Sequence, residues 1–164
     1  MKKIGIISDT HSYWDNNFIK YFSLCDEIWH AGDIGDLLIT DKLKEIAPLK
    51  GVYGNIDNHI IRQEFPKEIS FNYGSQNIFI THIGGHPKNY NKSSLEKIKT
   101  IKPQIFVCGH SHICKVIYDK TLNLLYINPG AAGIVGFHKV RTLIRFHLHS
   151  EKITNMEVIE LGSR

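Results

Sequence analysis

Seven side chains that can bind a metal ion follow short apolar segments of this 164-residue chain. Each segment has the composition of a buried strand. In an open α/β sheet, the loops that leave the carboxyl ends of the strands meet at one edge, so these side chains are expected to converge in space. They are Asp9, His11, Asp33, Asn55, His82, His110 and His112. The sequence therefore predicts a metal site at the edge of a sheet.

The local spacing of these residues supports a shared site. Within residues 9–11 and 110–112 the candidate ligands are two positions apart, which in extended backbone points both side chains to the same side. Three of the ligands directly follow a glycine. They are Asp33 after Gly32, Asn55 after Gly54 and His110 after Gly109. We expect each glycine to let the backbone turn tightly and approach an ion closely.

The chemistry of the donors narrows the choice of metal. Imidazole, carboxylate and amide groups without thiolate suit manganese, iron, nickel or zinc better than calcium, and the set exceeds what one tetrahedral ion needs. We therefore predict two divalent metal ions per chain that share one carboxylate, with manganese as the first expectation. Two such ions leave a surplus of about two positive charges over two aspartates, which favours an anionic substrate such as a phosphate ester.

The elements that position these residues alternate at first between strand and helix. The patterns predict strands at 3–8, 27–30 and 49–53 and amphipathic helices at 16–24 and 37–47. This order indicates a parallel sheet. The second half predicts a hairpin of 69–72 with 77–81, a helix at 93–101, and strands at 104–108, 115–119, 124–128, 141–149 and 152–160. No linker or repeat interrupts the pattern, so residues 1–164 are expected to form a single domain.

Composition bounds the class of protein. The chain is 42% hydrophobic but has no apolar stretch long enough to span a membrane. Its three cysteines, Cys25, Cys108 and Cys114, form no CxxC pair, so we expect a cytoplasmic protein without a disulfide framework. The net charge of +4 is scattered rather than gathered in a basic stripe, so nucleic acid is not implied as a partner.

The whole series of motifs resembles the calcineurin-like metallophosphoesterase superfamily, and within it the small single-domain bacterial and archaeal phosphodiesterases. The motifs are Asp9-x-His11, Gly32-Asp33, Gly54-Asn55, His82 and Gly109-His110-Ser111-His112. Their order and approximate spacing match the family over residues 4–112. The resemblance implies an α/β fold, specifically a four-layer αββα sandwich with a dimetal site at the strand ends.

The resemblance also implies how the site is divided. It assigns the first ion to Asp9, His11 and His112. It assigns the second ion to Asn55, His82 and His110, and it makes Asp33 the bridge between the two. A hydroxide that bridges the ions would then be the nucleophile, and no covalent protein intermediate would be needed.

Two departures from the family pattern concern catalysis. Ile56 stands where many relatives have a histidine that assists the leaving group, so we expect a stronger dependence of the rate on leaving-group pKa. His82 is not followed directly by glycine, and His86 is a candidate substitute that donates to the substrate. Asp57 either orients a ligand or the substrate, or forms a turn. His30 is expected to support the site rather than to bind metal.

Two later segments also bear on the site. Residues 128–130, Asn-Pro-Gly, resemble the turn that follows the metal motifs in relatives, and they are expected to support the site. Phe137 and His138 could line the pocket, but Gly133 and Gly136 around them predict only a flexible loop.

The function that the residues favour is a metal-dependent phosphodiesterase acting on small phosphodiesters. The alternatives are a phosphomonoesterase or nuclease of the same fold, or a non-catalytic scaffold, because one branch of the superfamily keeps the fold with a degenerate site in protein-trafficking complexes. The chain fills every ligand position, which favours the enzyme. Relatives form dimers or tetramers, and exposed strands of the second half could pair in a homodimer or homotetramer.

Overall fold

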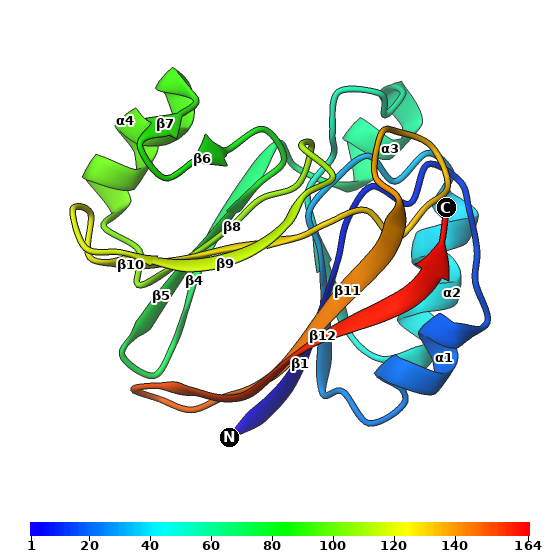
Figure 1. The fold of residues 1–164 in the computed structure, drawn as a ribbon, viewed down its shortest axis with the longest axis horizontal. Helices are drawn as coiled ribbons and strands as arrows, with labels where there is room; N and C mark the ends of the chain where they lie inside the picture. Colours follow the sequence, from blue (N-terminus) through cyan, green and yellow to red (C-terminus); the bar gives the residue numbers. More distant parts are fainter.

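The computed structural model describes residues 1–164 and contains two five-stranded sheets (Figure 1). The first sheet has the order β12 (Ile153–Ser163), β11 (Val140–Leu148), β1 (Lys2–Ile7), β2 (Glu27–His30) and β3 (Leu49–Gly51). The second has the order β4 (Glu68–Tyr73), β5 (Gln76–Thr81), β8 (Ile105–Val107), β10 (Leu124–Pro129) and β9 (Cys114–Asp119). The strands β1, β2 and β3 are parallel, as the βαβαβ pattern predicts.

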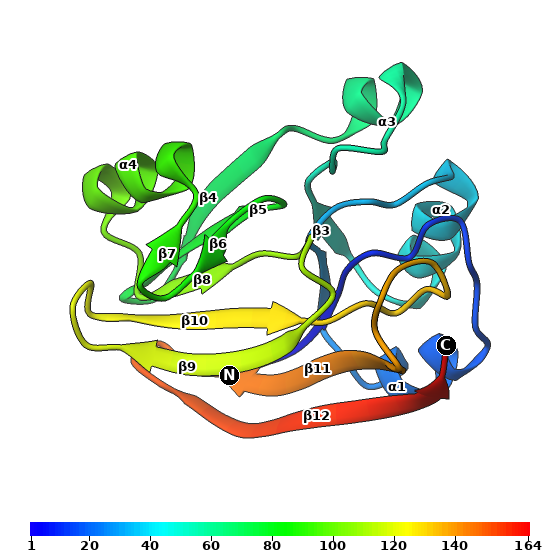
Figure 2. The ribbon, with the colours of Figure 1, turned by 45° about the horizontal axis from the view of Figure 1, so that its top comes forward.

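Helices cover the outer face of each sheet. On the first sheet lie α1 (Asn17–Phe22), α2 (Leu37–Ile46) and α3 (His59–Glu64), at the right in Figure 1. On the second sheet lies α4 (Lys92–Ile101), and Figure 2 shows it on the opposite side of the molecule from α2. The order helix, sheet, sheet, helix confirms the predicted four-layer αββα sandwich.

Alternating side chains build one core layer between the sheets and one beneath each set of helices. In β1, Ile4 and Ile6 enter the layer between the sheets, whereas Ile7 packs under the helices of the first sheet. Trp29 anchors the central layer, with its ring edge-to-face to Phe146 at a centroid distance of 5.7 Å. Both faces of the central strands are therefore buried, whereas the outer strands β9 and β12 are largely exposed.

The predicted elements agree with the observed ones to within a few residues, and two small features differ. No element was predicted around His59, but this segment forms α3. The Asn58 side chain accepts hydrogen bonds from the backbone N–H groups of Ile60 and Ile61, at 3.1 Å each, and Ile61 is buried. The short hairpin of β6 (Gly85–His86) and β7 (Asn89–Tyr90) was also not predicted. Both features are too short for a periodic pattern to reveal.

The outermost strands of the two sheets include β9 and β12. Exposed side chains of β9 include Ile117 and Tyr118, which are 41% and 53% exposed. Pairing of such strands between copies of the chain stays a prediction. None of the four helices combines the length and apolar content that crossing a membrane requires.

Arg141 ties the loop after β1 to the end of the last strand. Its guanidinium lies 2.8 Å from the carboxylate of Asp15. It also donates to the carbonyl oxygens of Ala132, Leu161 and Ser163, at 3.2, 2.9 and 3.1 Å. Arg141 is only 6% exposed, so these partners replace water for a buried cation.

We expect the substitution Arg141→Leu to lower the free energy of unfolding by about 3–5 kcal/mol, because it leaves a carboxylate and three carbonyl groups without their donor. Urea denaturation measures this, with the exposed Lys139→Leu as the control variant. Burial raises the pKa of Asp15, but the Asn17 backbone N–H and the Arg141 guanidinium outweigh it and hold this pKa below its usual value. The stabilisation from the ionised Asp15 carboxylate is therefore present at pH values above the pKa of aspartate in the unfolded protein. It is lost as the pH falls through the lower pKa that Asp15 has in the folded protein. A free energy of unfolding in Arg141→Leu equal to that of the wild-type protein would contradict the stabilising role of Arg141.

Candidate metal centre

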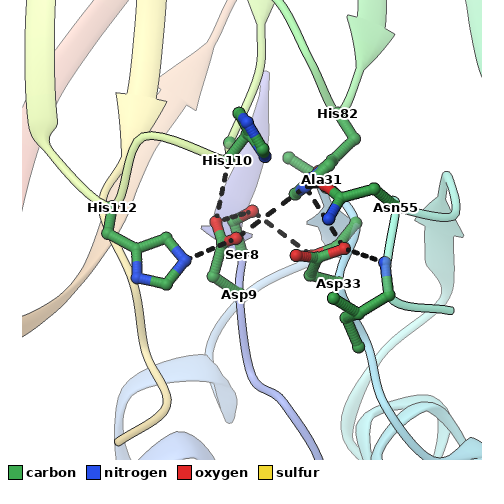
Figure 3. Close-up of polar contacts among 12 residues, drawn as sticks. Ser8, Asp9, Ala31, Asp33, Asn55, His82, His110 and His112 are labelled. Atoms are coloured by element: carbon green, nitrogen blue, oxygen red, sulfur yellow. Dashed lines mark hydrogen bonds and ion pairs between the residues drawn. The ribbon is translucent and has the colours of Figure 1, made fainter. Parts of the chain in front are cut away.

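The predicted ligands converge where strands of both sheets end (Figure 3). They lie in the loops that follow β1, β2, β3, β5 and β8. Two groups bring their ligand atoms within 4.8 Å of one another, and they consist of Asp9, His11 and His112 in one case and Asp33, His82 and His110 in the other. The structure therefore brings together the residues that the sequence singled out.

The first group is built around the carboxylate of Asp9, which is fully buried. Its Oδ2 accepts hydrogen bonds from the Ser8 hydroxyl at 2.6 Å and from the His110 backbone N–H at 3.1 Å. Its Oδ1 lies 3.1 Å from His112 Nε2 and 4.0 Å from His11 Nε2. The Nε2 of His82, from the second group, lies 3.9 Å from the same Oδ1. One oxygen of Asp9 is thus fixed by the protein, and the other faces three imidazole nitrogens.

The second group is built around Asp33 and His82. His82 Nε2 lies 3.2 Å from Asp33 Oδ1 and 3.1 Å from the Asn55 side-chain oxygen. The Nδ1 of His82 is 2.7 Å from the carbonyl oxygen of Ala31, so Nδ1 donates and the ring is held with Nε2 toward the carboxylates. The other oxygen of Asp33, Oδ2, is 3.5 Å from His11 Nε2, which places Asp33 between the two groups.

The carboxylates make the centre attractive to positive charge. Burial raises the pKa of Asp33, but its hydrogen bond to His82 and the charge on that ring outweigh burial and lower the pKa. Burial lowers the pKa of His82, but Asp33 and Asp9 outweigh it and raise the pKa. A cation and a proton therefore compete for the same position, as expected of a metal site.

Two buried atoms of the centre have no hydrogen-bond partner. They are Asp9 Oδ1 and His11 Nε2, and they face each other across the first group. Buried polar atoms are nearly always partnered, because an unpartnered one loses its hydration without compensation. Carboxylate oxygen and imidazole nitrogen are ligands of divalent transition ions. The two unpartnered atoms, Asp9 Oδ1 and His11 Nε2, therefore fit a bound metal ion.

Five of the predicted ligands have left-handed backbone. The φ angles of Asp9, His11, Asp33, His110 and His112 are 54, 45, 53, 68 and 58°. The expectation that residues 9–11 and 110–112 are extended is therefore wrong, because the chain turns sharply at each ligand. Such a conformation costs about 1–3 kcal/mol for a non-glycine residue and persists only where surrounding contacts enforce it. Here it aims the side chains inward.

The glycines before the ligands act mainly by giving room. Only Gly32 of the three has positive φ, at 97°. A Cβ on Gly54 would overlap the carboxylate of Asp33, and a Cβ on Gly109 would overlap the Ser8 hydroxyl. The three glycines therefore allow a close approach to side chains of the centre, whereas the predicted close approach to an ion stays a prediction.

His30 supports the site, as predicted. Its Nδ1 accepts from the Gly32 backbone N–H at 3.1 Å, and its Nε2 lies 3.0 Å from the Thr10 hydroxyl, which donates to the Ile34 carbonyl oxygen. Burial lowers the pKa of His30 to about 4, so the ring is neutral and donates from Nε2. The loops that carry Asp9 and Asp33 are thereby joined.

Asp57 is a positioning residue. Its buried carboxylate accepts hydrogen bonds from the backbone N–H groups of Gly54, Ile34 and Gly35, at 2.7, 3.1 and 2.8 Å. These bonds turn it toward the backbone, in keeping with both alternatives, that it orients a ligand and that it forms a turn. A part for Asp57 in catalysis stays a prediction. It joins the loop of Asp33 to the turn of Asn55.

Arg62 and Ser8 are site residues that sequence reasoning missed. Arg62 donates to the carbonyl oxygens of Asp57 and Asn55, at 2.7 and 3.2 Å. It thereby fixes the Asn55 turn from α3, an element that was itself not predicted. The hydroxyl of Ser8 donates to Asp9. A serine at a strand end gives no signal of such a role.

Asn128 supports the ligand loop that includes His110, as expected for residues 128–130. Its buried amide nitrogen donates to the Gly109 carbonyl oxygen at 2.8 Å and to the Ser111 hydroxyl at 3.1 Å. Beside it, Cys108 is fully buried, and burial raises the pKa of its thiol to about 12, so the thiol is inert packing.

Two cavities flank the centre. One of about 300 Å³ lies beside the second group and is lined by Asn55, His82, Arg62 and Lys67, among others. The other, of about 270 Å³, is lined by residues including His86, His110, Ser111 and Lys115. His86 is exposed and lines the same cavity as the candidate ligand His110. Its role as a hydrogen-bond donor to the substrate stays a prediction.

Comparison with known proteins defines the class that this fold and centre indicate. The calcineurin-like phosphoesterase superfamily domain matches residues 1–151. A phosphodiesterase of Methanocaldococcus jannaschii is 30% identical over 145 residues, which cover 78% of this chain and 82% of the relative. The chain therefore belongs to the calcineurin-like phosphoesterase superfamily, whose members use divalent metals.

Solved structures share the fold. An archaeal phosphodiesterase superimposes with a TM-score of 0.72 and 26% identity over 97% of this chain and 99% of that one. Vps29 of Chaetomium thermophilum superimposes with a TM-score of 0.78 at 17% identity over 100% of both chains. At that identity, the second likeness bears on the fold alone.

The substitution Gly54→Ala tests how closely the centre is packed. The added methyl group would overlap both the carboxylate and the backbone nitrogen of Asp33, so the Asp33 loop must shift, and we expect at least a tenfold loss of Mn²⁺ affinity. Isothermal titration calorimetry measures the affinity, and circular dichroism checks the fold. Gly162→Ala in β12 is the control, because it strains the backbone at a φ of 102° while its Cβ meets nothing within 4 Å. Wild-type Mn²⁺ affinity in Gly54→Ala would show that Asp33 does not bind the metal.

Proposed function

We propose that the protein is a dinuclear metal-dependent phosphodiesterase that acts on small phosphodiesters. The observation that carries this proposal is the pair of adjoining donor groups with two buried, unpartnered atoms, Asp9 Oδ1 and His11 Nε2. Membership of the superfamily and the phosphodiesterase relative support it.

In this proposal the residues divide as the family pattern implies. Asp9, His11 and His112 hold one cation, and Asn55, His82 and His110 hold the other. Asp33 contributes one oxygen to each, in keeping with its distances of 3.2 Å to His82 Nε2 and 3.5 Å to His11 Nε2. The cations, manganese first and nickel, iron or zinc as alternatives, would supply a water of lowered pKa and charge stabilisation for the phosphoryl oxygens.

The flanking cavities would take the two ester groups of the substrate. Each has a volume of about 270–300 Å³, which suits small groups better than a polymer. Arg62 and Lys67 line one cavity and Lys115 the other, so both present positive charge to a phosphodiester. His86 would donate a hydrogen bond from the second cavity.

The other functions receive less support. A scaffold has no need of a filled donor set, and the Vps29 likeness at 17% identity shows the fold alone. A nuclease would need a basic stripe along a groove, whereas the net charge of +4 is scattered. The three cysteines are free thiols, which is in keeping with our proposal of a cytoplasmic setting.

Hydrolysis of bis-p-nitrophenyl phosphate and p-nitrophenyl phosphate tests the activity. Metal-stripped protein is assayed with manganese, nickel, zinc or magnesium, alongside His112→Ala and the control His147→Ala, whose histidine lies in β11 outside the centre. We expect metal-dependent turnover that is faster on the diester and falls at least a hundredfold in His112→Ala only. Absence of turnover with every metal, despite bound ions, would favour the scaffold.

Ile56 generates a prediction about the leaving group. Its side chain is 46% exposed in the loop of Asn55 and can donate no proton. We expect the rate to fall steeply as leaving-group pKa rises across a series of aryl methyl phosphates, and Ile56→His to flatten this dependence. Ile56→Gln is the control, because it adds polarity without an imidazole. A flat dependence in the wild-type protein would contradict the prediction.

A further inference from the structure

His138 contacts the candidate ligand His112 from outside the centre. It lies in the loop between β10 and β11, and its Nδ1 is 3.2 Å from His112 Nδ1. Its other ring nitrogen, Nε2, is 2.9 Å from the carbonyl oxygen of Gly133. The opposite nitrogen of His112, Nε2, is 3.1 Å from Asp9 Oδ1, and Figure 3 shows this edge of the ring turned toward Asp9.

The direction of each hydrogen bond follows from the acceptor at the end of the chain. The carbonyl oxygen of Gly133 can only accept, so His138 Nε2 donates. A neutral imidazole carries one N–H, which leaves His138 Nδ1 as an acceptor. His112 Nδ1 must then donate to it, and the lone pair of His112 is at Nε2, toward Asp9.

We propose that His138 is a positioning residue that fixes the Nδ1–H tautomer of His112 and so aims its Nε2 lone pair at the first metal position. The inference rests on the proposed function for the role of His112 as a ligand. His82 offers a direct comparison, because its Nδ1 is fixed by a backbone carbonyl group, that of Ala31. At His112 a second imidazole takes that place, and Gly133 supplies the carbonyl oxygen one step further out.

The loop is shaped to hold His138 against His112. Gly136 has a φ of 130°, and a Cβ there would overlap the His112 ring. The backbone N–H of Arg164 donates to the Lys139 carbonyl oxygen at 3.1 Å, and its guanidinium donates to the Gly136 carbonyl oxygen. The lack of a side chain at Gly136 therefore allows close packing on the His112 ring. The predicted flexibility of this loop stays a prediction.

Nuclear magnetic resonance tests the hydrogen bond itself. In metal-free protein labelled with ¹⁵N on histidine, at a pH where both rings are neutral, we expect a scalar coupling between His112 Nδ1 and His138 Nδ1 across the bond. We also expect His112 to carry its proton on Nδ1. A proton on His112 Nε2, or no coupling, would overturn the proposal. This readout needs neither metal nor activity, so its failure is distinct from failure of the proposed function.

Titration with Zn²⁺ tests the consequence for metal binding. His138→Phe keeps a ring against His112 but removes the acceptor, and we expect the affinity of one of two ions to fall at least tenfold while the other is unchanged. His138→Gln offers an acceptor oxygen and should recover most of the loss, and Phe137→Ala is the control from the same loop. Wild-type Zn²⁺ affinity in His138→Phe, or an equal loss in His138→Phe and His138→Gln, would make His138 a packing residue only.

Discussion

Two carboxylates buried side by side are the constraint on which this structure depends. The side chains of Asp9 and Asp33 are 0% and 3% exposed. A buried charge is tolerated only when it is paired and hydrogen-bonded. Ser8, the backbone N–H of His110 and His82 meet part of that need, but Asp9 Oδ1 has no hydrogen-bond partner. Bound cations would supply the partner that Asp9 Oδ1 lacks within the protein.

The scaffold is arranged to keep this costly cluster in place. Both sheets contribute loops from buried strand ends, so the ligands follow strands that are packed into the core. Left-handed backbone at five ligands stores conformational energy that the packing must offset. His30 and Asp57 bond the ligand loops to one another, and Arg62 holds the Asn55 turn from α3. The site is therefore preorganised by hydrogen bonds among its loops.

The sequence revealed the strands and the convergence of the ligands because both leave a local signal. Apolar runs ending at Asp9, Asp33 and His82 place those residues at strand ends, whatever the side chains do there. The conformation at the ligands left no such signal, since left-handed φ at non-glycine residues depends on contacts made far away in sequence. The contact of His138 with His112 spans 26 residues and likewise follows only from the assembled fold. Short elements such as α3 lie below the length at which periodicity is informative.

Electron paramagnetic resonance of the Mn²⁺-loaded protein tests the central claim most directly. If Asp33 bridges two ions between the donor groups of Asp9 and His82, the spectrum should show an exchange-coupled pair at two Mn²⁺ per chain. In Asp33→Asn, the loss of a shared carboxylate should leave isolated, uncoupled Mn²⁺. Isolated Mn²⁺ in the wild-type protein, or a coupled pair that survives in Asp33→Asn, would contradict the account.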